Sequence, residues 1–244
     1  LLEEPCGSLF ESLSKESKDK VELTLSHPLD DPPLRGVGER YAGLRKMQLT
    51  VTDKQLPDDF SKLTTLKNLA VSGLHTATDS LKLPMLQTLR LASCRLTRLP
   101  PELFYLQHLT ELRLWSMITI RSLPDEQELS ADCAILPSLN LVEIAACRSL
   151  AGLPSWLLQH SGITSLHILN SSRAEVEDFS ALTSLRVLDL RACPVSYRSL
   201  QSVATLPHLK ELSLDSSYVS VLPQDLLLMP CLEMINADET GLSR

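Results

Sequence analysis

One apolar pattern recurs along most of the chain and limits the folds open to it. Residues 86–108 read LxxLxLxxCxLxxLPxxLxxLxx, where x is any residue. Such a unit is too short to bury its own leucines, so neighbouring copies must stack and share one core. A degenerate first unit opens near residue 20, with a strand expected at residues 21–25. The later units begin at Leu44, Leu66, Leu86, Leu109, Leu139, Ile163, Leu185, Leu209 and Leu232.

The composition agrees with one packing site that is repeated many times. Leucine supplies 53 of the 244 residues, against four Phe, two Trp and four Tyr. In each LxL step the side chains alternate between two faces, as in a strand, and the remaining leucines return along the outside. The pattern predicts a curved, right-handed α/β solenoid. A parallel sheet forms its concave face, and short 3₁₀, polyproline II or helical segments form its convex face, entered at Leu-Pro steps such as Leu99-Pro100.

The two ends and one unit depart from the repeat. Apolar residues at helical spacing over residues 6–18 predict an amphipathic helix, so we expect residues 1–20 to cap the repeat domain of residues 21–244. A new unit is abandoned at Arg244, and we expect the parent protein to continue past it. The unit that begins at Leu109 is 30 residues long. Its acidic insertion, residues 124–138, either borders a binding surface or is a solvated loop.

Charge and motifs exclude several classes of function. The net charge is -7 and the isoelectric point about 5.4, which disfavours nucleic-acid binding. No apolar run approaches the roughly 20 residues that cross a bilayer, so we expect no membrane contact. The HExxH, GxSxG, GxGxxG and P-loop patterns are missing from the sequence. We therefore predict that this chain is not an enzyme and has no catalytic, cofactor or metal site. We also expect it to be a monomer.

Three of the six cysteines occupy one repeat position. Cys94, Cys147 and Cys193 each follow an LxL step at the same distance, where a small buried group with a weak S–H donor fits. Cys6, Cys133 and Cys231 show no CxxC spacing. The sequence therefore predicts reduced thiols and an intracellular, reducing compartment.

The register of the repeat predicts which side chains leave the concave face. The residues that flank the inward leucines form a central column and a neighbouring column. In both columns, basic residues come mainly from earlier units and acidic residues from later units. The central column contains Gln48, Ala70, Arg90, Arg113, Glu143, His167, Asp189, Ser213 and Asn236. The neighbouring column contains Thr50, Ser72, Ala92, Trp115, Ala145, Leu169, Arg191, Asp215 and Asp238. The predicted protein-binding residues are Arg90, Arg113, Trp115, Glu143, His167, Leu169, Asp189, Arg191 and Asp215.

Two of these positions carry specific hypotheses. An outward tryptophan beside arginines is typical of binding hot spots, so Trp115 is expected to contact a partner; the alternatives are a chance exposed aromatic or one covered by residues 124–138. His167 is expected between Glu143 and Asp189, about 4.8 Å from each strand. This group is either a solvated ladder of charges or an acid–base site.

The repeat resembles the leucine-rich-repeat family over roughly residues 20–244. The resemblance implies a solenoid that binds other macromolecules, and in that family the position of Cys94 normally holds an inward asparagine bonded to backbone. The opening segment, residues 20–33, is similar to type III effectors of plant-pathogenic bacteria of the Xanthomonas outer protein L type. That likeness implies a target-recognition domain that acts in the host-cell cytoplasm and presents substrates to a downstream ubiquitin-ligase domain.

The segment from Cys147 to Pro154 supports a different member of the family. It looks like a motif in the repeat domains of plant intracellular immune receptors, which the bacterial effectors share. A plant receptor domain or another cytosolic leucine-rich-repeat scaffold is therefore the alternative. Both readings imply that the partner is a protein bound on the concave face.

Overall fold

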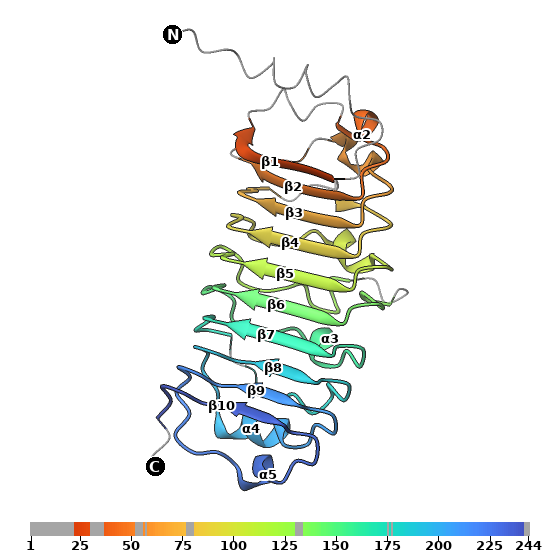
Figure 1. Ribbon diagram of the computed structural model, residues 1–244. Coiled ribbons are helices and arrows are strands. Elements are labelled where there is room, and N and C mark those ends of the chain that lie inside the picture. Colours follow the sequence, from red (N-terminus) through yellow and green to blue (C-terminus); the bar gives the residue numbers. More distant parts are fainter. Residues whose placement is uncertain are drawn as a thin grey trace, which may run out of the picture.

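Every repeat unit contributes one strand to a single parallel sheet. The computed structural model describes residues 22–29, 37–51, 56, 58–76, 81–129, 134–174, 176 and 178–241. Its strands pair in chain order, so the units stack like rungs (Figure 1). The expected cap helix at residues 6–18 lies outside the described residues. The strands are β1 (Glu22–Leu29), β2 (Lys46–Val51), β3 (Asn68–Ser72), β4 (Thr88–Ala92), β5 (Glu111–Trp115), β6 (Leu141–Ala145), β7 (Ser165–Leu169), β8 (Val187–Asp189), β9 (Glu211–Ser213) and β10 (Met234–Asn236).

Alternation within each strand separates the core from the opposite face of the sheet. In β3 to β7 the second and fourth residues are buried and the other three are partly exposed. Leu89 and Leu91 of β4, for example, are 0% exposed. The buried residues face the connecting segments, so one continuous apolar core lies between the sheet and these segments. The solenoid predicted from the repeat is confirmed.

The connecting segments are short, as the unit length requires. They contain the helices α2 (Val37–Arg40), α3 (Ser155–Leu158), α4 (Tyr197–Val203) and α5 (Gln224–Leu227) and the 3₁₀ helices η2 (Asp58–Lys62) and η4 (Pro101–Tyr105). Pro100, Pro154 and Pro223 stand directly before η4, α3 and α5 with φ of -64°, -71° and -57° and ψ of 134°, 155° and 136°. These angles confirm polyproline II geometry at the Leu-Pro steps. None of the described helices is long and apolar enough to span a membrane.

Backbone hydrogen bonds fix the entry of each strand. One carbonyl of a unit accepts two successive N–H groups of the next unit: the Arg45 oxygen accepts from Lys67 at 2.8 Å and from Asn68 at 2.9 Å. The Lys67 oxygen then accepts from Gln87 and Thr88 in the same way. The pattern continues with the carbonyls of Gln87, Thr110, Asn140, Thr164, Arg186 and Lys210. Every strand from β3 to β10 is thereby placed at the same height relative to its neighbour.

A left-handed residue fixes the exit of each strand from β3 to β10. Ala146, for example, follows β6 with φ 55° and donates its N–H to the Leu169 oxygen at 2.8 Å. This conformation disfavours side chains with a Cβ, yet in the described part of the chain the only glycine that adopts it is Gly73. The directional bond to the next unit therefore outweighs the local strain. The equivalent residues with positive φ are Gly73, Ser93, Ser116, Ala146, Asn170, Ala192, Ser216 and Glu239.

The cysteine position predicted from the repeat is confirmed as structural. Cys94, Cys147 and Cys193 are at most 2% exposed, and each thiol contacts backbone carbonyls: the Cys193 Sγ lies 3.0 Å from the Ile168 oxygen. Burial raises the pKa of all three thiols, so they stay protonated. Ser171 occupies the same position in another unit and accepts a bond from the Cys147 N–H at 3.2 Å. The position thus takes small groups that bond to backbone, and in two other units it takes the buried apolar side chains of Leu74 and Met117. Cys6 and Cys133 lie outside the described residues.

The long unit is anchored on the side of the sheet that carries the helices. Trp156 of α3 packs edge-on against Phe104 of η4, with ring centroids 5.4 Å apart. Its Nε1 donates to the Pro124 oxygen at 2.9 Å, and the Leu136 N–H donates to the Phe104 oxygen at 2.9 Å. Leu129 is 5% exposed. Leu129 and Leu136 thus belong to the core, whereas the acidic Asp125, Glu126 and Glu128 of the insertion are exposed.

We predict that the left-handed position tolerates glycine but not a β-branched residue. Ala146→Val should lower the free energy of unfolding by about 1–2 kcal/mol, because valine is strongly disfavoured at positive φ. Ala146→Gly should change it by less than about 0.5 kcal/mol. Urea unfolding monitored by circular dichroism measures both. Ala145→Val, one residue earlier in extended strand, is the matched control; an equal loss there would show that volume rather than backbone conformation decides.

Candidate functional site

The side of the sheet opposite the core presents the columns predicted from the repeat. We call it the open face and define it by Arg90, Arg113, Trp115, Glu143, His167, Leu169, Asp189, Arg191 and Asp215. The pairing of β2 to β10 has the predicted register along the central column, from Gln48 to Asn236. In the neighbouring column, Thr50 to Leu169 pair within strands. Arg191 and Asp215 follow β8 and β9 in the chain.

Trp115 lies on the open face, but its side chain is partly covered by Arg90. Its ring is half-buried, and the Arg90 guanidinium lies over it with Cζ 4.3 Å from the ring centroid. This distance is typical of a cation–π contact. The buried Nε1 of Trp115 has no hydrogen-bond acceptor among the described residues. The described ends of the insertion contact η4 and α3 instead, on the other side of the sheet.

Arg113 is held between two carboxylates. Its Nη1 donates to Glu143 at 2.9 Å and its Nη2 donates to Glu111 at 3.1 Å. The Arg113 and Glu143 side chains are 25% and 16% exposed, so both ion pairs are partly shielded from water. The Nε of Arg113 is buried and has no acceptor among the described residues. Arg113 and Trp115, two positions apart on β5, thus both keep an unsatisfied N–H donor.

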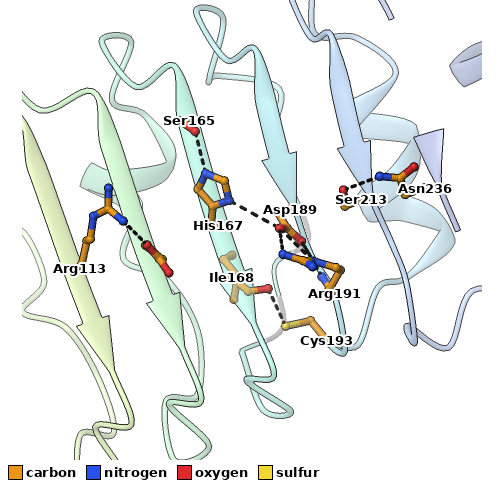
Figure 2. A network of polar contacts seen from close by, with 10 residues as sticks. Arg113, Ser165, His167, Ile168, Asp189, Arg191, Cys193, Ser213 and Asn236 are labelled. Carbon is orange, nitrogen blue, oxygen red and sulfur yellow. Dashed lines mark hydrogen bonds and ion pairs between the residues drawn. The ribbon is translucent and has the colours of Figure 1, made fainter. Parts of the chain in front are cut away.

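A second network joins β7 to the end of β8 (Figure 2). The Ser165 hydroxyl lies 2.8 Å from Nε2 of His167, and Nδ1 of His167 lies 3.6 Å from the Asp189 carboxylate. Arg191 donates two hydrogen bonds to the same carboxylate. Its Nε lies 2.9 Å from Oδ1 and its Nη2 lies 2.7 Å from Oδ2. Of the two carboxylates expected beside His167, only Asp189 pairs with it, because Glu143 accepts from Arg113.

Asp189 is the most buried charged group of this network. Its side chain is only 8% exposed. Burial works against its ionisation, but the hydrogen bonds from His167 and Arg191 outweigh burial and hold the pKa of the Asp189 carboxyl below its ordinary value. A paired carboxylate in this position orients the two side chains on either side of it. The acidic end of the open face is therefore rigid, whereas Asp215 only accepts the Asp238 backbone N–H, at 2.9 Å.

The order hydroxyl, imidazole, carboxylate is also that of the catalytic relay in serine hydrolases. A relay needs a short bond from imidazole to carboxylate and free N–H donors near the nucleophile. The His167–Asp189 distance is 3.6 Å, and both Asp189 oxygens accept from Arg191. The Ser165 N–H donates to the Asn140 oxygen within the sheet. This geometry suits a fixed charge network better than nucleophilic catalysis. No group of His, Cys, Asp and Glu side chains in the described ranges could hold a metal ion.

Two residues of these networks were not predicted from the sequence. Glu111 and Ser165 occupy the first position of β5 and β7, a third outward column that precedes the two columns read from the repeat. Each bonds to the residue two positions later on its own strand, Arg113 and His167. The alternation of side chains along a strand could have predicted their position, because the first, third and fifth residues of each strand share one face.

We predict that Asp189 stabilises the fold in a pH-dependent way. Because its pKa is lower in the folded chain than in the unfolded chain, its contribution is complete above the unfolded value of about 3.9 and disappears as the pH falls through the lower folded value. Asp189→Asn should therefore cost about 2 kcal/mol at pH 7 and progressively less below about pH 4. Thermal unfolding of both proteins across pH measures this. The exposed Asp125→Asn is the control, and a cost for Asp189→Asn that is independent of pH would contradict the assignment.

The comparisons with known proteins agree with the architecture. A family model described as Leucine Rich Repeat matches residues 85–106. None of the curated proteins matches the chain in sequence. Solved structures do: Toll of Drosophila, in its complex with Spätzle, is similar with a TM-score of 0.67 and 19% identity over 98% of this chain and 35% of Toll.

Two further structures come from different biological settings. The leucine-rich-repeat domain of the type III effector XopL has a TM-score of 0.61 and 21% identity, over 95% of this chain and 80% of that domain. The ectodomain of the Arabidopsis thaliana receptor kinase GASSHO1, in complex with CASPARIAN STRIP INTEGRITY FACTOR 2, has a TM-score of 0.58 and 19% identity, over 84% of this chain and 25% of that ectodomain. The chain thus spans about a third of Toll and a quarter of the GASSHO1 ectodomain, and it has the solenoid fold of leucine-rich-repeat proteins.

Proposed function

We propose that the chain is a protein-recognition domain that binds its partner on the open face, around Arg90 and Trp115. The observation that carries this proposal is the set of unused donors there. Arg90 makes no ion pair with a described residue, and the buried N–H groups of Arg113 and Trp115 have no acceptor among the described residues. Unsatisfied buried donors cost free energy, so a ligand that displaces the side chains covering them and supplies acceptors gains affinity by pairing them.

The charges of the open face define the chemistry of the partner. A carboxylate or a run of backbone carbonyls suits the Arg90–Trp115 end, while basic side chains suit the end with Asp215 and Asp238. Arg113, His167 and Arg191 are already paired within the protein and hold the surface between these ends in one shape. Toll and GASSHO1 were solved with protein or peptide partners, which supports protein binding by this fold.

Trp115→Ala should weaken partner binding strongly without loss of stability. A displayed library of random peptides, selected against the immobilised protein, should yield acidic and apolar sequences with the wild type. Binding of the selected peptides should fall by roughly a hundredfold in Trp115→Ala, as for a hot-spot aromatic, and by roughly tenfold in Arg90→Ala. Affinities from isothermal titration and melting temperatures from calorimetry separate binding from folding.

A second aromatic provides the matched control for this experiment. Tyr218 is 90% exposed and lies outside the open face, so Tyr218→Ala should leave the selected peptides bound. Selected peptides that bind Trp115→Ala as well as the wild type would place the binding surface elsewhere. Unfolding of Trp115→Ala would instead show that the indole supports the fold.

We also propose, at a finer level, that the chain is the target-recognition domain of a type III effector that acts in plant cells and is joined to a ubiquitin-ligase domain. The opening segment of residues 20–33, the Leu-Pro units and the unpaired thiols of Cys94, Cys147 and Cys193 support this proposal. A reducing host cytoplasm suits free thiols. In this proposal the chain itself does no chemistry.

The ubiquitin-ligase proposal has a direct test. The parent protein, with ubiquitin, activating enzyme and conjugating enzyme, should form ubiquitin chains, whereas residues 1–244 alone should not. A parent protein that binds nucleotide and forms no chains would favour the alternative, the repeat domain of a plant immune receptor. Chain formation by residues 1–244 alone would contradict both readings.

A further inference from the structure

A cavity lies away from the open face, at the edge of the solenoid where β4, β5 and β6 end. Its volume is about 540 Å³. Its lining combines two guanidinium groups, from Arg98 and Arg121, with the hydroxyls of Thr97 and Ser122 and one exposed apolar side chain, Ile118. Three successive loops contribute these residues, so the same backbone ladder that aligns the strands brings them together.

The hydroxyls of the cavity divide into structural groups and unused groups. Thr119 donates to the Leu96 oxygen at 2.7 Å and Ser149 donates to the Ile118 oxygen at 2.6 Å, which ties the loops to one another. Thr97 and Ser122 make no hydrogen bond with the rest of the described chain, and Arg121 makes no ion pair within it. A rigid rim therefore surrounds two hydroxyl donors and one unpaired guanidinium.

Several arginines gather at this edge although the chain has a net charge of -7 and the exposed Asp125 and Glu126 follow Ser122 in the chain. Arg95 and Arg148 are exposed on the loops beside the cavity, and Arg173 is exposed in the next unit along. Glu128 of the insertion already contacts the edge: its carboxylate lies 3.3 Å from Nη1 of Arg98, with the two side chains 44% and 77% exposed. An exposed pair of this kind contributes little stability, so a stronger anion can displace it.

We propose that this cavity binds a phosphorylated serine or threonine on a protein partner, with Glu128 as an internal competitor. Arg98 and Arg121 present planar forks that match a phosphate dianion, and Thr97 and Ser122 supply hydroxyl donors for its remaining oxygens. Ile118, 58% exposed, packs against the carbon atoms next to the phosphate. The site is independent of the binding surface around Trp115, so either can exist without the other.

The probe is a short synthetic peptide that carries one phosphoserine among alanines and glycines. Titrated into the ¹⁵N-labelled protein at low salt, it should shift the backbone resonances of residues 95–98 and 119–122 and leave those of β7 to β9 unchanged. Arg121→Ala and Arg98→Ala should each weaken its affinity by roughly tenfold, as expected for one charge-assisted contact. Glu128→Gln should strengthen it several-fold, because the competing carboxylate is removed.

Matched controls decide between outcomes. Arg186→Ala removes an exposed arginine elsewhere and should change nothing. The unphosphorylated peptide should not bind, and inorganic phosphate should bind more weakly than the phosphopeptide because it lacks the contact with Ile118. Binding that is equal in the wild type, Arg98→Ala and Arg121→Ala would overturn the site. Binding only to phosphatidylcholine vesicles that contain phosphatidylinositol phosphate would overturn a protein partner as its source.

Discussion

The hydrogen bonds between neighbouring units are the interaction on which this structure depends. A strand has no partner within its own unit, so its N–H and C=O groups are satisfied only by the strands on either side. Apolar packing alone does not fix the alignment, because a slip by two residues still leaves leucines on the inner face. The carbonyl that accepts two N–H groups at the entry and the left-handed residue at the exit remove this freedom.

This alignment turns the open face into a set of columns in which side chains from different units meet. Arg113 contacts Glu143, and His167 contacts Asp189, because the register places them on adjacent strands at equal height. The polar groups of the open face are not equally well paired. Arg191 and His167 pair with Asp189, whereas two buried N–H groups around Trp115 find no acceptor among the residues that the structure describes. The first region is preorganised, and the second is where a partner has most to offer.

Much of the fold could be predicted because the same pattern of apolar residues recurs in every unit. The strands, their register, the buried Cys94, Cys147 and Cys193 and the Leu-Pro geometry all follow from positions that recur. Contacts that occur once could not be read in this way. The packing of Trp156 on Phe104 joins the two units on either side of the one that carries the insertion, and the acidic composition of that insertion indicated either the border of a binding surface or a solvated loop.

The candidate site was predictable in position but not in contacts. The sequence placed Arg90 and Trp115 on the same face, but side-chain rotation decides that the guanidinium covers the ring. It placed His167 between two carboxylates, but Arg113 competes for Glu143. The cavity at Arg98 and Arg121 was not predicted, because whether side chains from three neighbouring loops leave a hollow depends on their packing, which the repeat pattern does not show.

The left-handed residue at the end of each strand also bears on how such a chain can diversify. The position takes alanine, serine or asparagine with similar φ and the same backbone bond, so among residues without a β-branch side-chain identity there carries little structural information. The scaffold is therefore encoded by the leucines and the backbone, and the surface is encoded separately. A lineage can change the recognition residues of one unit, or duplicate a whole unit, without redesigning its neighbours. Asp189 is the exception, since its loss would free both His167 and Arg191 and alter three surface positions together.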